Sequence, residues 1–306
     1  MYSFIKWLGS LMERAKKNKG FWFTFLSVIS IIGIFLSLFF VNYLVSDVAK
    51  KTYENQKNSF QLRLKSQFIT QKDRTLVIAT TATQNDEVKN LFVSDDINAS
   101  NKIKKSAKQL QMKISKNLDN KNFSVNFEQN EKFAELKIIN GIDVGDNGTH
   151  FKATVPFVKT ETFVSNIIVR ENIETLVNVF KNENREFLFI INESGINKVD
   201  TSIRKQEYKK IFKDYNVKED AYSGNFINDV RVIDFEKLSL NGYLKDKNYF
   251  YVSQSVFDID GDEIGVAIIA EDMSADNSFV NLVKNLVNSV TTVALGLIVS
   301  MVLFLF

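Results

Sequence analysis

The chain has 306 residues, a net charge of +3, one histidine, one proline and no cysteine. The absence of cysteine excludes disulfide bonds, thiolate metal sites and cysteine nucleophiles. The single histidine, His150, argues against multi-histidine zinc sites and Ser-His-Asp triads. The composition therefore favours a protein that is not an enzyme, and it predicts no cofactor, no metal site and no catalytic residue.

Two long apolar runs lie near the ends of the chain. Residues 21–45, FWFTFLSVISIIGIFLSLFFVNYLV, are uncharged and long enough to cross a bilayer as a helix. Residues 286–306 form the second run, and Lys284 is placed to reach the membrane surface. The first run is too long for the core of a cleaved signal peptide, and no convincing cleavage site follows it. The sequence therefore predicts two transmembrane helices.

The charges beside these runs predict their orientation. Residues 1–20 are strongly basic and are expected in the cytoplasm, as an amphipathic helix on the inner leaflet or as a plain basic anchor. The segment between the runs is slightly acidic and lacks a basic stripe, which argues against nucleic acid binding. We expect residues 46–280 to be extracytoplasmic (periplasmic), with the chain in a bacterial inner membrane. The chain stops at the second run, and we expect it to be the front part of a longer protein rather than one without a cytoplasmic output.

Helical patterns begin the outer segment. No glycine or proline interrupts residues 46–92, and Phe60, Leu64 and Phe68 recur every four residues. This spacing predicts one long helix that continues from the first span. Apolar residues at three- and four-residue steps predict a second helix over residues 102–118.

Strand patterns separated by turn-rich segments follow. Strands are predicted over residues 124–129, 134–140, 150–158, 163–170, 187–192, 248–257 and 263–272. Short helices are predicted over residues 171–181 and 205–214, and a turn over residues 193–195. This mixture of elements predicts an α+β fold.

The chain contains an internal repeat. Residues 155–173 align without a gap onto residues 255–273, and both copies have the pattern strand, tight turn, apolar strand and acidic exit. The repeat predicts two modules in tandem, a distal one over about residues 70–181 and a proximal one over about residues 182–275.

The turn of the second copy is rich in acidic residues, FDIDGDE over residues 257–263. Asp260 and Gly261 are a strong hairpin signal, because glycine accepts the positive φ that such turns need. The acidic residues lack the spacing of an EF-hand loop, and strands rather than helices flank them. We therefore interpret this segment as a turn and not as a calcium site.

The order of span, long outer helix, two α/β modules and second span resembles the double Cache sensor domains of bacterial receptors. The hairpin VFDIDGDEIGVAIIAED over residues 256–272, its earlier counterpart, and FLFIINESG over residues 187–195 carry this resemblance. It implies two PAS-like modules, each with an antiparallel sheet flanked by helices. It also implies a homodimer that binds a small molecule and signals through the second span to a chemotaxis, kinase or cyclase output, with cytoplasmic signalling partners.

Two groups of residues are candidates for binding the ligand. The distal candidates, which alternate on one face of a predicted strand, are His150, Lys152 and Thr154. The alternative for them is a solvated sheet face. The proximal candidates, which suit a carboxylate because arginine presents a bidentate fork, are Arg204, Tyr208, Tyr249 and Tyr251. The alternative for these is surface salt bridges and core tyrosines.

The ligand class does not follow from the resemblance. Amino-acid-binding members of the family carry an arginine followed by tryptophan and tyrosine on a helix. Here Arg204, Tyr208 and Tyr215 depart from that pattern, because no tryptophan is present among them and they fall in the proximal module.

A competing interpretation is a two-span scaffold or accessory protein of the cell envelope that binds no ligand. Chain-length regulators of polysaccharide synthesis share this layout, but they carry a proline-rich approach to the second span. Pro156 is the only proline of this chain, which argues against them. An enzyme on the outer side is a third interpretation, disfavoured by the missing nucleophile and metal patterns.

Overall fold

A computed structural model describes residues 19–85, 105, 107–112, 123–130, 137–160, 163–273, 283–289, 291–293, 295, 296 and 299. Lys57–Ala275 form one compact unit, and Met1–Gln56 with Asp276–Phe306 belong to a second unit. The predictions for residues 1–18, for most side chains of residues 21–45 and for much of 286–306 lie outside this description. In the part of the chain that is described, no helix meets the length and apolarity that crossing a membrane requires.

Helix α2 runs from Lys19 to Gln84, so the first apolar run and the predicted outer helix share one continuous helix. Asn85 is not helical, so α2 ends before the predicted residue 92, and residues 86–92 lie outside the described residues. In the compact unit, one face of α2 is buried at three- and four-residue steps, as the sequence predicts. The buried residues are Phe60, Leu64, Phe68, Gln71, Thr75, Ala79 and Ala82.

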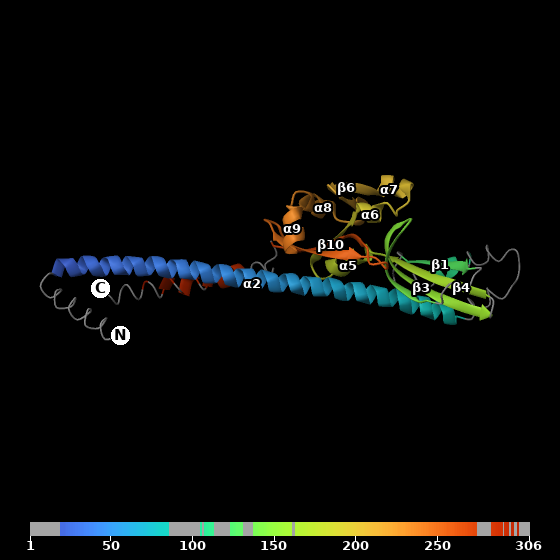
Figure 1. Ribbon diagram of the computed structural model, residues 1–306, viewed down its shortest axis with the longest axis horizontal. Coiled ribbons are helices and arrows are strands. Elements are labelled where there is room, and N and C mark those ends of the chain that lie inside the picture. Colours follow the sequence, from blue (N-terminus) through green and yellow to red (C-terminus); the bar gives the residue numbers. More distant parts are fainter. Residues whose placement is uncertain are drawn as a thin grey trace. The chain divides into compact units, whose positions relative to one another are not determined.

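The first sheet has the strand order β1-β4-β3-β2, and all its neighbouring strands are antiparallel. Its strands are β1 (Phe123–Asn130), β2 (Ile139–Gly145), β3 (Gly148–Thr160) and β4 (Phe163–Asn172). One face packs against Ala79 and Ala82 of α2, which runs along this sheet in Figure 1. The α2 side of the sheet is therefore a hydrophobic core.

The second sheet has the order β6-β7-β5-β10-β9-β8, again with antiparallel neighbours. Its strands are β5 (Arg185–Asn192), β6 (Tyr208–Phe212), β7 (Tyr215–Lys218), β8 (Tyr243–Lys245), β9 (Tyr249–Phe257) and β10 (Glu263–Asp272). Its helices are α5 (Thr175–Lys181), α6 (Glu193–Ile196), α7 (Thr201–Glu207), α8 (Gly224–Arg231) and α9 (Phe235–Asn241), with a 3-10 turn η1 (Glu219–Ala221). Both sheets together make the fold α+β, as predicted.

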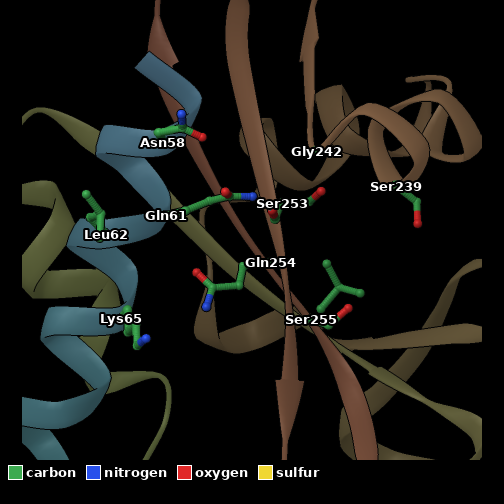
Figure 2. Close-up of a pocket in the computed structure, with 10 residues that line it drawn as sticks. Asn58, Gln61, Leu62, Lys65, Ser239, Gly242, Ser253, Gln254 and Ser255 are labelled. Carbon is green, nitrogen blue, oxygen red and sulfur yellow. Dashed lines mark hydrogen bonds between the residues drawn. The ribbon is translucent and has the colours of Figure 1, made fainter. Parts of the chain in front are cut away.

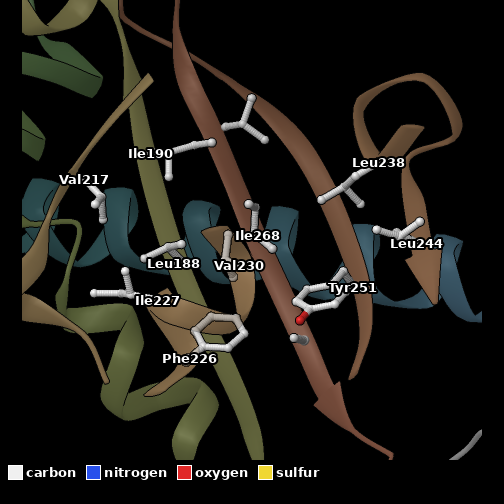
Figure 3. Close-up of a cluster of buried hydrophobic side chains, with 12 residues drawn as sticks. Leu188, Ile190, Val217, Phe226, Ile227, Val230, Leu238, Leu244, Tyr251 and Ile268 are labelled. Atoms are coloured by element: carbon white, nitrogen blue, oxygen red, sulfur yellow. The ribbon is translucent and has the colours of Figure 1, made fainter. Parts of the chain in front are cut away.

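Both faces of the second sheet are covered. On one face Phe60 of α2 packs edge-on against Phe250, and a pocket of about 610 Å³ lies between α2 and β9 (Figure 2). On the other face α8 and α9 cover a core that includes Leu188, Ile268 and Phe226 (Figure 3). Because both faces are buried, the central strand β10 is a nearly continuous apolar run rather than an alternating one.

The two sheets share a topology. The order β1-β4-β3-β2 of the first sheet corresponds to β5-β10-β9-β8 of the second, which adds the hairpin β6–β7 at one edge. The hairpin strands β4 (Phe163–Asn172) and β10 (Glu263–Asp272) stand at the same offset as the internal repeat in the sequence. The repeat therefore corresponds to a repeated arrangement of strands.

Several predicted boundaries are wrong. The strand expected over 134–140 is β2 (Ile139–Gly145), while residues 137 and 138 are not in a strand. Gly141 is a residue of β2, and its missing side chain makes room for Ile259. The short helix α5 begins at Thr175 instead of 171, because β4 extends to Asn172.

Two further elements differ from the predictions because of hydrogen bonds that the sequence pattern does not reveal. The helix expected over 205–214 ends at Glu207, and β6 follows because it pairs with β7. The expected turn over 193–195 is the short helix α6, whose first turn is capped when the Asn192 side chain accepts a hydrogen bond from Gly195 N–H at 2.8 Å. The helix predicted over 102–118 is described as helical only at residues 105 and 107–112.

Candidate functional site

The β2–β3 hairpin of the first sheet docks against loops of the second sheet. The backbone N–H of Ile259 donates to the carbonyl of Ile142 at 2.9 Å, and the Ile259 side chain lies over Gly141. On the other side of the hairpin, Asp200 N–H donates to the carbonyl of Asp146 at 3.1 Å. The β9–β10 turn and the segment before α7 therefore hold the hairpin between them.

We expect Gly141→Ala to lower the free energy of unfolding by about 1–2 kcal/mol, because overpacking a tight contact is destabilising. A Cβ at position 141 would lie 2.3 Å from Cγ2 of Ile259. Ile259→Ala removes that atom, so the double variant should lose about 1 kcal/mol less than the sum of the single losses. Urea unfolding of the four proteins, followed by circular dichroism, measures this coupling. If the loss of the double variant equals the sum of the two single losses, the contact between Gly141 and Ile259 is contradicted.

The acidic turn FDIDGDE is organised by one buried carboxylate. Asp258 Oδ1 accepts hydrogen bonds from the backbone N–H groups of Asp260 at 3.0 Å and Asp262 at 2.9 Å, and Gly261 has φ 88°. Lys198 Nζ donates to the other Asp258 oxygen at 2.7 Å. Burial alone would raise the pKa of Asp258, but the bonds from Lys198 and the backbone outweigh it and lower the pKa. The prediction of a hairpin turn with positive φ at Gly261 is confirmed.

The three distal candidates lie together on the face of the first sheet that is opposite α2. In the register of the sheet, His150 is paired with Asp143 and Lys152 with Arg170. His150 and Thr154 are each only 6% exposed, so the alternative of a solvated face does not hold for them. Lys152 Nζ forms an ion pair with Asp143 Oδ2 at 2.7 Å.

Two polar atoms of this face are buried without a hydrogen-bond partner. They are His150 Nδ1 and Thr154 Oγ1, and the statement covers the part of the chain that the structure describes. Burial, followed by the positive charge of Arg170, lowers the pKa of His150 to about 4, against the opposing effects of Asp143 and a bond to the Gly148 backbone. The imidazole is therefore neutral at pH 7. Buried polar atoms of this kind call for a partner such as water or a ligand.

Arg170 completes the face and was missed by the sequence interpretation. It lies opposite Lys152 in the β3–β4 register and is half-buried, and its Nη1 donates to the side-chain oxygen of Asn126 at 3.0 Å. Side chains alternate between the two faces of a strand, and Ile167 and Val169 are buried on the α2 side. Arg170 therefore lies on the opposite, polar face. A half-buried guanidinium beside a neutral imidazole can bind an anionic group through two parallel hydrogen bonds.

The structure does not bring the four proximal candidates into one site. Tyr208 lies in the edge strand β6, whereas Tyr249 and Tyr251 lie in β9, with β7, β5 and β10 between them. At a strand spacing of about 4.8 Å, that separation is roughly 19 Å. Arg204 lies in α7 and donates from Nη1 to Oδ1 of Asn197 at 2.8 Å. No carboxylate clamp can form from residues placed in this way.

The tyrosines of the proximal set have structural contacts. Tyr251 is fully buried in the core beside Phe226, and its hydroxyl donates to Asp246 Oδ2 at 3.1 Å (Figure 3). Tyr249 packs edge-on against Phe226. Tyr208 is buried with its hydroxyl against Gly148, so it belongs to the contact between the two sheets. Burial, and then the charge of Glu174, raises the pKa of Tyr208, so its hydroxyl stays neutral.

Comparisons with known proteins add little. No protein-family model matches the chain, and no curated protein matches it. A solved structure of the ligand-binding domain of Mlp24 with asparagine aligns with 81% of this chain and 97% of that chain, at 10% identity and a TM-score of 0.21. A likeness at this level carries no argument about fold or ligand.

Among the described residues, no group of three or more His, Asp or Glu side chains is arranged to hold a metal ion.

Proposed function

We propose that this chain is the sensory part of a membrane-anchored bacterial receptor, whose residues 46–280 lie outside the cytoplasm and bind a small molecule. The observation that carries the proposal is the polar face of the first sheet. There the buried, unpartnered atoms of His150 and Thr154 lie on the same face as the cations of Lys152 and Arg170. A small metabolite with an anionic group and hydrogen-bonding groups would satisfy them.

The docked β2–β3 hairpin provides a route for the signal. A ligand on the first sheet prefers one arrangement of β3 and the hairpin, and Ile259 carries that preference into the β9–β10 turn. Strand β10 (Glu263–Asp272) precedes the second apolar run in the sequence. The shift in population can be no larger than the difference in ligand affinity between the two arrangements.

Membrane anchoring rests on the two apolar runs and on one observation from α2. The large apolar side chains of Ile32, Phe35, Leu36 and Phe39 are exposed on this helix. Contiguous exposed apolar surface of this kind is stabilised by contact with lipid or with another helix. This supports a helix in the membrane, and the second run, the homodimer and a cytoplasmic signalling partner belong to the same proposal through the resemblance to double Cache receptors.

A thermal-shift screen of the full chain in lipid nanodiscs tests the proposal. The compounds are amino acids, dicarboxylates and other small carboxylates, each at a concentration far above its expected dissociation constant. A ligand at about 100 times its dissociation constant should stabilise the folded protein by about 2.7 kcal/mol. The same compound should not stabilise Arg170→Gln, but it should stabilise the control Lys209→Gln, which alters an exposed lysine of β6. A screen without any stabilising compound would favour the ligand-free scaffold instead.

A further inference from the structure

The pocket between α2 and β9 lies beside the second sheet (Figure 2). It is separate from the polar face around His150, which belongs to the first sheet. Its volume of about 610 Å³ is in the range of small-molecule sites. Its polar lining consists of three side-chain amides, three serine hydroxyls and one lysine, and Leu62 and Val266 add apolar surface. This lining is rich in neutral hydrogen-bonding groups that come from three different elements, α2, α9 and β9.

Gln254 supplies the first requirement for an occupant. Its side chain projects from β9 toward α2 in Figure 2, and its Oε1 atom is buried without a hydrogen-bond partner among the described residues. The neighbouring Gln61 is already engaged, because its Nε2 donates to the carbonyl of Ser253 at 3.0 Å. A buried acceptor without a partner is unfavourable, so the occupant should donate a hydrogen bond to Gln254.

Gly242 helps to keep the pocket open. This residue ends α9 in the left-handed conformation, with φ 72°. A side chain there would be strained, and its Cβ would lie 3.3 Å from Nε2 of Gln61 and 3.2 Å from Cδ of Lys57. Glycine therefore preserves both the bend after α9 and the position of Gln61 at the pocket wall.

Lys65 supplies the second requirement. Among the described residues of the lining it is the one ionisable side chain, with no carboxylate beside it, and it lies on α2 one turn beyond Gln61. An occupant with a single anionic group would therefore be attracted to this end of the pocket. The hydroxyl groups of Ser239 and Ser255 suit a partner that itself carries several hydroxyl groups, whereas the Ser253 hydroxyl already donates to the carbonyl of Leu238 at 3.2 Å.

We propose that this pocket binds a small hydroxylated carboxylate, of the class of the sugar acids. The carboxylate lies at Lys65, one hydroxyl group donates to Gln254, and the remaining hydroxyl groups contact Ser239 and Ser255. The site is independent of the polar face of the first sheet, so it gives the outer part of the chain a second ligand.

Calorimetric titration of the full chain in detergent tests the proposal with D-glucuronate, D-galacturonate and D-gluconate. At least one of them should bind with a dissociation constant below about 1 mM. D-glucose, which lacks the charge, and acetate, which lacks the hydroxyl groups, should each bind at least about tenfold more weakly. If none of the three sugar acids shows saturable binding, the proposal is wrong.

Two variants tie the binding to this pocket. Lys65→Gln changes an exposed side chain and should weaken sugar-acid binding at least about tenfold. The affinity of this variant for the sugar acid should then be closer to its affinity for D-glucose. Gln254→Leu should weaken binding by a similar factor. Without ligand its unfolding midpoint should be unchanged or higher, because it removes a buried acceptor that has no partner.

Arg170→Gln separates this site from the proposed sensory face. It should leave sugar-acid binding unchanged, as should the control Lys209→Gln. Sugar-acid binding that depends on Arg170 but not on Lys65 would overturn the pocket proposal while supporting the function assigned to the first sheet. Binding that depends on Lys65 and Gln254 supports the pocket proposal, whatever the screen of the first sheet finds.

Discussion

Replacing Gly265 with alanine is expected to lower the free energy of unfolding by about 3 kcal/mol or more, because the new methyl group meets backbone that cannot move aside. Gly265 lies in β10 at the centre of the second sheet, between Ile191 of β5 and Val256 of β9. A Cβ at this position would lie 2.2 Å from the carbonyl oxygen of Ile190 and 2.9 Å from the ring of Phe189. Relief would require β10 to move away from β5.

Urea unfolding followed by circular dichroism measures this loss, and Gly145→Ala is the matched control. Gly145 also lies in a strand, at the end of β2, but no atom of the described residues lies within 4 Å of a Cβ placed there. Its replacement should change the free energy of unfolding by less than about 1 kcal/mol, and can be stabilising because alanine restricts the unfolded chain. Equal effects of the two replacements would contradict the close packing of β10 against β5.

The second large effect is a dependence of stability on pH that comes from His150. The folded protein holds this imidazole neutral, with its pKa lowered to about 4, mainly by burial and then by Arg170. The unfolded chain takes up a proton at about pH 6.5, so acid favours unfolding. The contribution of His150 to the free energy of unfolding is therefore fully present above about pH 6.5. It decreases as the pH falls and stays constant below about pH 4. The total loss is up to about 3 kcal/mol.

The chain has one histidine, so His150→Gln isolates this contribution. Carboxylates titrate in both proteins, and the difference between wild type and variant removes them. The groups that act on His150 are Arg170, Asp143 and Lys218, and all three remain in the variant. Denaturant unfolding between about pH 4 and 7 should show a steeper decrease for the wild type. Parallel curves would mean that His150 is not buried in a neutral form.

Periodic patterns account for the parts of the fold that the sequence predicts well. The four-residue steps of Phe60, Leu64 and Phe68 predict the buried face of α2, because a helix that packs against a core on one side buries a single stripe of residues. The apolar run of β10 and its repeat in β4 predict both hairpins. No element was predicted over residues 215–247, which contain the short elements β7, α8, α9 and β8, although the buried residues of α8, Phe226, Ile227 and Val230, recur at helical steps.

The sequence also predicts only part of the candidate site. Strand alternation places His150, Lys152 and Thr154 on one face, and the structure confirms that placement. Arg170 needed the register between β3 and β4, which no single strand reveals. The proposed grouping of Tyr208 with Tyr249 failed because it assumed neighbours in a sheet whose strand order separates them. The pocket at Gln254 depends on which strand α2 packs against, and the spacing of the apolar residues of α2 predicts its buried face but not that strand.

The central claim is that the polar face of the first sheet binds the small molecule that the receptor senses. The most direct measurement is calorimetric titration of the full chain, in nanodiscs, with the most stabilising compound from the screen. We predict saturable binding to the wild type and to Lys65→Gln, with at least a tenfold weaker affinity for Arg170→Gln, about 1.4 kcal/mol. Binding that is unaffected by Arg170→Gln, or absent from the wild type, would contradict the claim.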